Sequence, residues 1–408
     1  MGGLLPGMSK ELEAKINEIL TRGVAEVIDK NRLKERLLSG EKLRIKLGID
    51  PTSPNLHLGR AVTLLKLKDL QELGHKIIFI IGDFTGVIGD ASDKESERPM
   101  LDSKTVEKNL ATYKEQAGRF LDLSQAEVHY NSEWLAKLGY KEIAEQADIF
   151  SVAEFNAREN VKNRLQNGAR VSLREMLYPL LQGYDSVMVK ADLELGGTDQ
   201  RFNLLAGREM QKHYGQNSQD ILMVNLIEGT DGRKMSSSWG NTINILDEPN
   251  DIFGKVMSIP DELIIKYFIH CTRTSMESVK KMEKDMAGGK FNPRDAKLEL
   301  ATEIVKIYHG TKEAEKAQKY FINTFSKKEI PNDVQVVPSP APEVSVLDYM
   351  VEAGLAKSKS DARRKIEQGG VEIDGKRMID TNLTLDERYD GKVIKGGKIH
   401  FVRIKFSK

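Results

Sequence analysis

The chain has 408 residues, 39% of them apolar and 30% charged, which is typical of a globular protein with at least one large core. Its 62 Lys and Arg residues nearly balance its 61 Asp and Glu residues, so a nucleic-acid-binding surface would have to be local. The one cysteine, Cys271, excludes an internal disulfide and a cysteine-rich metal site.

The sequence shows no pattern of export or of membrane insertion. Residues 1–15 lack a cationic segment followed by a long apolar core, so they do not have the pattern of a secretory signal. No run approaches the ~18 apolar residues that a membrane span needs. We therefore expect a cytoplasmic protein without membrane contact.

The N-terminal part predicts helices, then a strand, a turn and another helix. Apolar residues recur at helical spacing over 9–39, an apolar strand is expected at 43–49, and a helix is expected from Leu58. Backbone N–H groups of the turn and of the helix start would point at one place and form an anion site. This unit fits a nucleotide-binding half of a doubly wound sheet; the alternative is an ordinary strand–turn–helix with an incidental His57.

A second strand is expected at 75–83, which contains a continuous apolar run. Such a run is typical of a strand that is buried on both faces of a parallel sheet. A glycine-rich loop is predicted at 84–90, at the strand end where ligands bind in open α/β sheets.

The middle of the chain predicts an insertion. Residues 102–185 are expected to be mainly helical, with a short strand at 127–130, and this stretch is too long for a single crossover. Further strands are expected near 187–191 and at 221–227. Strand–helix pairs on both sides of the insertion predict a split nucleotide-binding fold.

The last part of the chain predicts helices, a linker and a small basic module. The pattern is helical from about 250 to 325, and four prolines in 331–342 indicate a linker. Residues 345–408 contain 14 Lys and Arg against 10 Asp and Glu, with a charged helix before short strands. A basic α/β module after a linker predicts RNA contact, and a merely solvated charged helix is the alternative.

Five short motifs then occur in a fixed order. They are HLGR at 57–60, TGVIGD at 85–90, YPLLQGYDS at 178–186, GGTDQ at 196–200 and KMSSS at 234–238. HLGR resembles the HIGH signature of class I aminoacyl-tRNA synthetases, KMSSS resembles their KMSKS loop, and the set resembles that of tyrosyl-tRNA synthetases. The terminal block is similar to the S-four-type RNA-binding domain that many bacterial members carry.

The resemblance implies an α/β fold in several parts. These are a Rossmann-like, parallel-sheet catalytic domain at 1–247 with a helical insertion at about 102–185, an α-helical anticodon-region domain at 248–330, a linker at 331–344, and an S-four-type RNA-binding domain at 345–408. It also implies ATP-dependent ligation of L-tyrosine to tRNA(Tyr) through tyrosyl-adenylate, with release of pyrophosphate and AMP. A homodimer is implied, as is Mg²⁺ entering with ATP.

Three groups of site residues follow from the resemblance, and none of them is a metal ligand. The catalytic group is Thr52, His57, Arg60, Lys94, Arg98 and Lys234. The ATP-binding group is Asp50, His57, Gly59, Gly197, Asp199, Leu226, Ile227 and Lys234. The tyrosine-binding group is Gly48, Asp90, Tyr178, Gln182, Asp185 and Gln200.

Four positions depart from the family pattern. Arg60 replaces the final histidine of HIGH, and Ser237 replaces the second lysine of KMSKS. Lys46 stands where one branch of the family has a tyrosine that contacts the substrate phenol, whereas another branch resembles this chain and has KLG there. Glu194 in place of a glutamine is a smaller difference. We expect Arg60 to contact ATP and to compensate in part for the charge missing at Ser237.

The substrate's own carboxylate is the nucleophile in this reaction, so no Ser–His–Asp set is expected. The alternatives are a tryptophanyl-type synthetase, a non-catalytic RNA-binding paralogue and another HxGH-type nucleotidyltransferase. Asp185, as an acceptor for a phenol, and the terminal module favour the tyrosyl enzyme.

Overall fold

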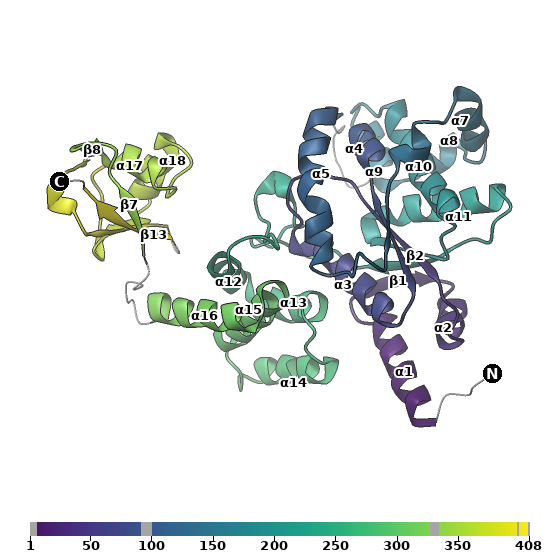
Figure 1. Ribbon diagram of the computed structural model, residues 1–408, viewed down its shortest axis with the longest axis horizontal. Helices are drawn as coiled ribbons and strands as arrows, with labels where there is room; N and C mark the ends of the chain where they lie inside the picture. Colours follow the sequence, from purple (N-terminus) through teal and green to yellow (C-terminus); the bar gives the residue numbers. More distant parts are fainter. Residues whose placement is uncertain (1–5, 91–99, 327–333, 398–399, 407–408) are drawn as a thin grey trace. The chain divides into compact units, whose positions relative to one another are not determined.

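The computed structural model describes residues 6–90, 100–326, 334–397 and 400–406 (Figure 1). The chain divides into two compact units. One comprises residues 1–247 and 255–308, and the other comprises residues 248–254 and 309–408. The segment 248–330, predicted as one helical domain, is therefore shared between the two units.

The first unit is built on a six-stranded sheet with the strand order β1-β6-β5-β2-β3-β4. The strands are β1 Val24–Ile28, β2 Arg44–Ile49, β3 Lys76–Ile81, β4 Glu127–Tyr130, β5 Leu193–Gly197 and β6 Asp220–Val224. All neighbouring strands run parallel except β1, which is antiparallel to β6 at the edge of the sheet. This arrangement confirms the predicted Rossmann-like parallel sheet.

Helices surround this sheet (Figure 1). Up to the last strand they are α1 Pro6–Ile19, α2 Lys30–Leu38, α3 Leu58–Glu72, α4 Asp83–Ile88, α5 Ser103–Gly118, α6 Ser132–Leu135, α7 Tyr140–Ala147, α8 Val152–Asn156, α9 Glu159–Gln166, α10 Leu173–Met188 and α11 Arg201–His213. The first unit also contains α13 Ile264–Cys271, α14 Met276–Ala287 and, up to Tyr308, α15 Pro293–His309, whereas most of α12 Pro249–Met257 and all of α16 Thr311–Phe321 belong to the second unit.

The central strands are buried on both faces, as their apolar runs predict. Every residue of β3 from Ile77 to Ile81 has no exposed surface. Helices therefore cover both faces of the strand, and polar groups can gather only beyond the strand ends. This leaves the carboxyl ends of β2, β3 and β5 as the place where a site can form.

Three local predictions in this unit are wrong. Residues 24–28, expected within a helix, form β1, because the β-branched run VAEVI finds a distant partner in β6. The strand expected near 187–191 begins only at Leu193, because α10 continues to Met188. The loop expected at 84–90 is largely α4, which begins at Asp83 after the N-cap residue Gly82.

The second unit contains a small sheet with the strand order β10-β9-β12-β13-β7. Its strands are β7 Gln335–Pro338, β9 Val371–Ile373, β10 Lys376–Arg377, β12 Val393–Gly396 and β13 His400–Lys405, and β8 Val344–Ser345 pairs separately with β11 Thr384–Leu385. Helices α17 Val346–Glu352 and α18 Lys359–Glu367 pack in the same module.

Strand β7 lies in the segment that was predicted as a linker. It pairs in parallel with β13, and its Val337 belongs to the core of the C-terminal module. Tyr349 donates a hydrogen bond of 2.8 Å to the carbonyl oxygen of Val337. Pro338 is tolerated because β7 is an edge strand and Pro338 is its last residue.

Within the described residues, none of the helices has the length and apolar character that crossing a membrane requires.

Candidate active site

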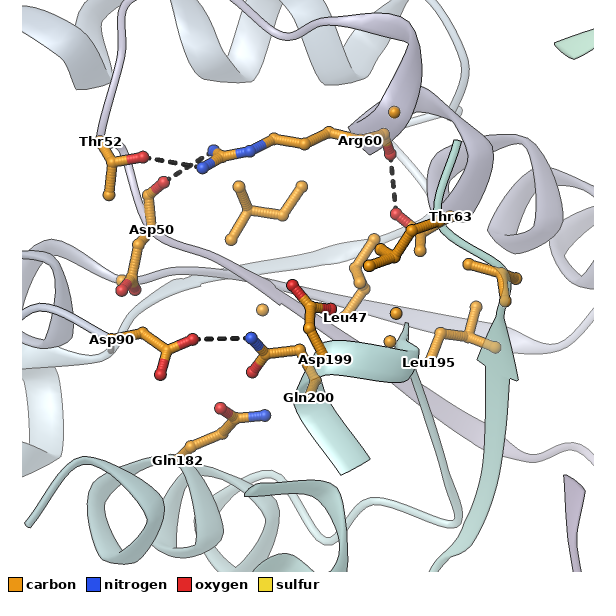
Figure 2. A pocket seen from close by; sticks show the side chains of 18 of the residues that line it. Leu47, Asp50, Thr52, Arg60, Thr63, Asp90, Gln182, Leu195, Asp199 and Gln200 are labelled. Atoms are coloured by element: carbon orange, nitrogen blue, oxygen red, sulfur yellow. Dashed lines mark hydrogen bonds between the residues drawn. The ribbon is translucent and has the colours of Figure 1, made fainter. Parts of the chain in front are cut away.

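The carboxyl ends of the parallel strands enclose a cavity of about 270 Å³ in the first unit. Sixteen of the predicted site residues line it: Gly48, Asp50, Thr52, His57, Gly59, Arg60, Asp90, Tyr178, Gln182, Asp185, Gly197, Asp199, Gln200, Leu226, Ile227 and Lys234. The two others, Lys94 and Arg98, lie outside the described residues. Residues of all five sequence motifs, far apart along the chain, thus line one cavity. Figure 2 shows part of this cavity, with Arg60, Asp90, Gln182, Asp199 and Gln200.

One wall of the cavity is formed by the turn between β2 and α3. His57 is the N-cap residue of α3, only 8% exposed, and its Nδ1 atom has no hydrogen-bond partner within the described structure. Burial, together with the positive charges of Arg60 and Lys234, lowers the pKa of His57 to about 3. The imidazole is therefore neutral at physiological pH, and one ring nitrogen carries a proton to donate.

Arg60 reaches across this turn (Figure 2). Its Nη1 donates to the carbonyl oxygen of Asp50 at 2.9 Å and to the Tyr113 hydroxyl at 3.0 Å, and its Nη2 donates to Thr52 Oγ1 at 2.7 Å. The Thr52 oxygen accepts from the guanidinium, so its own proton stays available for another acceptor. Arg60 lines the cavity, and its hydrogen bonds to Asp50 and Thr52 hold the turn.

The carboxylate of Asp50 joins three elements. It accepts hydrogen bonds from the Thr85 hydroxyl at 2.7 Å and from the Tyr178 hydroxyl at 2.8 Å. Burial raises the pKa of Asp50 to about 6, although both hydrogen bonds oppose the shift. Because the Tyr178 hydroxyl donates its hydrogen bond to Asp50, its oxygen can accept a hydrogen bond from an ammonium group in the cavity.

Asp90 and Gln200 form a second polar pair on the cavity wall (Figure 2). Gln200 Nε2 donates to Asp90 Oδ2 at 2.7 Å, and Asn203 donates to Gln200 Oε1 at 2.9 Å. The orientation of the Gln200 amide is thereby fixed from both sides, and its nitrogen is turned toward a carboxylate.

Asp185 lies at the buried end of the cavity and is 4% exposed. Trp134 Nε1 donates to its Oδ1 at 2.7 Å, and Asn131 Nδ2 donates to its Oδ2 at 3.2 Å. Burial raises the pKa of Asp185 to about 7, while Lys46 and these two donors oppose the shift. Sequence reasoning missed Trp134 and Asn131; their place directly after the predicted strand 127–130 was the available signal.

Lys46 is fully buried and does not line the cavity. It stands directly opposite Glu194 on the neighbouring parallel strand, and its Nζ lies 2.9 Å from Glu194 Oε1. The two family departures at these positions therefore form one buried ion pair.

Lys234 and Asp199 form an ion pair of 3.1 Å at the mouth of the site. A Cβ at Gly197 would come within 2.6 Å of Asp199 Oδ1 and 2.9 Å of Leu226 Cδ2, so these two side chains would have to shift. Ser237 lies on the same loop as Lys234, and its hydroxyl is 3.4 Å from that of Ser53. The loop that carries Lys234 thus contacts the turn after β2.

Comparisons to known proteins identify the family of the chain. A family model described as class I tRNA synthetases (W and Y) matches residues 38–326, and a model described as the tyrosine–tRNA ligase SYY-like C-terminal domain matches residues 327–404. The molecule is therefore a class I tRNA synthetase by fold and by sequence.

Two similar proteins show which family within this class the chain belongs to. The tyrosine–tRNA ligase of Thermotoga maritima is 46% identical over 95% of this chain and 96% of its own. Tyrosine–tRNA ligase 2 of Clostridium acetobutylicum is 45% identical over 97% of this chain and 99% of its own. The chain belongs to the tyrosine–tRNA ligase family.

A solved structure supports the fold alone. The C-terminally truncated mitochondrial tyrosyl-tRNA synthetase of Aspergillus nidulans aligns with a TM-score of 0.64 at 20% identity, covering 79% of this chain and all of that one. The tryptophanyl-type and non-catalytic alternatives gain no support from these relatives.

Proposed function

We propose that the chain ligates L-tyrosine to tRNA(Tyr) in two ATP-dependent steps, and that the cavity of the first unit performs both. The observation that carries this proposal is that Asp185, which is 4% exposed, lines the same cavity as Thr52, His57 and Lys234. An acceptor for a phenol and donors for phosphates thus lie in one cavity.

The part of the cavity near Thr52, His57 and Lys234 suits ATP. Thr52 and neutral His57 can donate to the phosphates, and Lys234 adds a positive charge, with Lys94 and Arg98 as further cations by resemblance. Asp199 can accept from the ribose hydroxyls once Lys234 turns to the phosphates. Leu226 and Ile227 offer apolar contact to adenine, beside the backbone at Gly197 and Gly59.

The buried end suits tyrosine. Asp185 accepts from the phenol, and Gly48 leaves space for the ring, because a Cβ there would meet nothing within 4 Å. Asp90 and the Tyr178 oxygen accept hydrogen bonds from the α-ammonium group. Gln182 and Gln200 line the same part of the cavity.

Catalysis in this arrangement rests on position and charge. A carboxylate oxygen of tyrosine attacks the α-phosphorus of ATP, the bond to the β-phosphate oxygen breaks, and pyrophosphate leaves with the electron pair. A terminal ribose hydroxyl of tRNA then attacks the tyrosyl carbonyl carbon, and AMP leaves. Donors at Thr52, His57 and Lys234 stabilise the charge that develops on the leaving phosphates.

The C-terminal module is proposed to bind tRNA. Helix α18 carries Arg363 and Arg364, which are both exposed, at the start of a compact sheet module. Its exposed basic side chains suit a phosphate backbone.

We also propose a homodimer that forms through the helical insertion. Large apolar side chains are exposed there: Tyr140 is 95%, Val152 67% and Leu173 79% exposed, and Leu177 lies one helical turn after Leu173. Sedimentation of the protein and of a Leu173→Glu variant tests this; a monomeric unmodified protein at micromolar concentration contradicts it.

Mg²⁺ is proposed to enter with ATP. In the part of the chain that is described, no group of three or more His, Cys, Asp or Glu side chains could hold a metal ion. A cytoplasmic location remains a prediction from the sequence.

Amino-acid-dependent ATP–pyrophosphate exchange, followed by charging of tRNA, tests the proposed activity. We expect exchange with L-tyrosine and hardly any with tryptophan or phenylalanine. Equal stimulation by tryptophan would contradict the role of Asp185, since the single donor of an indole, its ring N–H, is not in the position of the phenol hydroxyl.

A further inference from the structure

Glu194 is a buried carboxylate at the wall of the cavity, and all its contacts are internal to the protein. It is 1% exposed, and its neighbour across the sheet, Lys46, has no exposed surface. Four donors surround the carboxylate. Oε1 accepts from Lys46 at 2.9 Å and from Gln182 Nε2 at 3.1 Å, and Oε2 accepts from Ser186 Oγ at 3.1 Å and from Gln219 Nε2.

Lys46 is equally well satisfied. Besides the ion pair, its Nζ donates to the carbonyl oxygen of Gln182 at 2.9 Å and to Ser186 Oγ at 2.7 Å. An ammonium group has three protons, and these three acceptors use all of them. A buried charge pair with every hydrogen bond made is held firmly, and loss of one partner leaves an uncompensated charge.

This ion pair determines how the Gln182 amide is oriented. An ionised carboxylate can only accept hydrogen bonds, so the atom of Gln182 that faces Glu194 must be the nitrogen. The amide oxygen, on the other branch of the planar group, is then the atom turned to the cavity that Gln182 lines. Figure 2 shows this amide beside the Asp90–Gln200 pair.

We propose that Glu194, neutralised by Lys46, is a positioning residue that keeps the Gln182 amide oxygen facing the α-ammonium group of the amino-acid substrate. This inference rests on the proposed tyrosine-binding function. The reverse amide orientation would present N–H donors to a cation, and electrostatic repulsion would weaken every ligand that carries the ammonium group. Ligands without that group would be unaffected.

The test compares ligands with and without the amine. Tyramine keeps the ammonium group and the phenol, whereas 3-(4-hydroxyphenyl)propionate keeps the carboxylate and the phenol. Binding of both, and of L-tyrosine, is measured by calorimetric displacement on the full chain. Glu194→Asp keeps the charge for Lys46 but shortens the side chain by one methylene, so that the carboxylate no longer reaches Gln182.

We expect Glu194→Asp to weaken the binding of tyramine and of tyrosine about tenfold or more. It should weaken the binding of 3-(4-hydroxyphenyl)propionate less than about twofold. Glu194→Gln is the conservative variant, because its carbonyl oxygen, held by Lys46, can still accept from Gln182; it should keep amine selectivity while losing thermal stability. Ser186→Ala is the matched control: it removes a contact of Glu194 without touching the Gln182 side chain, and should shift all three ligands equally.

If Glu194→Asp weakens the binding of amine-bearing and amine-free ligands equally, Glu194 has a general structural role and the proposal is overturned. The proposal is also overturned if Glu194→Asp weakens the binding of none of the ligands. If Glu194→Asp does not fold, Lys46→Met/Glu194→Met replaces it, since an apolar pair of similar volume is often tolerated at a buried ion pair. If the unmodified protein binds no tyrosine, the proposed function fails; if it binds tyrosine but Gln182→Met has no amine-selective effect, the assignment of Gln182 fails.

Discussion

The guanidinium of Arg60 donates from Nη2 to the hydroxyl oxygen of Thr52 at 2.7 Å, eight residues back along the chain. Together with the bond from Nη1 to the Asp50 carbonyl, this fixes the turn after β2. Arg60 therefore positions Thr52, the proposed phosphate donor, and its expected direct contact with ATP stays a prediction. The oxygen of Thr52 is occupied, so its proton points elsewhere.

Substitution of Arg60 should therefore act through Thr52. We expect Arg60→Ala to slow adenylate formation about tenfold, or ~1.4 kcal/mol, and to have less than about threefold effect when Thr52 is already alanine. Single-turnover kinetics of the two single variants and the double variant measure this coupling. Additive effects of the two substitutions would mean that Arg60 acts on the nucleotide independently.

Asp185 should lower stability at neutral and alkaline pH. Its folded-state pKa of about 7 lies above the ordinary value of 3.8, so its contribution to stability is greatest below pH 3.8 and is lost as pH rises through 7. We expect the melting temperature of Asp185→Asn, relative to the unmodified protein, to rise between pH 5 and pH 8. The same variant should lose tyrosine-dependent exchange.

Scanning calorimetry across this pH range provides the measurement. Asp148→Asn, at an exposed aspartate, is the control and should show no such trend. A pH-independent difference in melting temperature for Asp185→Asn would show that the ionised carboxylate costs nothing in the folded protein.

Gly48 tests where the ring of the substrate lies. A Cβ at this position meets nothing within 4 Å, although Leu47 and Ile49 on either side are buried. We expect Gly48→Ala to fold normally but to raise the KM for tyrosine about tenfold, with the KM for ATP changed less than about threefold. Gly118→Ala, where a Cβ would make an ordinary contact of 3.5 Å in α5, is the control. An unchanged tyrosine KM would place the ring elsewhere.

The end of the catalytic part can be defined by truncation. Removal of residues 327–408 should leave tyrosine-dependent exchange near normal and abolish most tRNA charging at physiological salt, because the basic module is lost. Removal of residues 345–408 should in addition promote aggregation, since β7 would lose its partner β13 and expose an unpaired edge. Full charging by either truncated protein would contradict the RNA-binding role.

The parallel sheet could be predicted from local patterns, whereas the candidate site residues came from the resemblance to a family, and the structure brings sixteen of them to one cavity. The continuous apolar run of β3 and the motif order needed no knowledge of distant partners. The strand β1 was missed because its identity depends on pairing with β6, almost two hundred residues away. Elements that are defined by a remote partner are not encoded in a short window.

The same limit applied within the site. The contacts of Arg60 could not be predicted from HLGR, because one acceptor, Tyr113, comes from α5. Lys46 and Glu194 were each recognised as departures from the family, but only the register of β2 against β5 shows that they stand opposite one another. Two positions that look independent in the sequence form one ion pair in the structure.

Asp50 connects the two proposed substrate sites, so binding of one substrate should affect binding of the other. Its carboxylate accepts a hydrogen bond from the Tyr178 hydroxyl at the proposed tyrosine end, while its carbonyl oxygen accepts from Arg60 at the proposed ATP end. A displacement of either group moves the same residue, so occupancy of one half of the cavity should alter affinity in the other. The Kd of tyrosine should therefore change in the presence of a non-hydrolysable ATP analogue, and thermodynamic reciprocity requires the analogue's own Kd to change by the same factor.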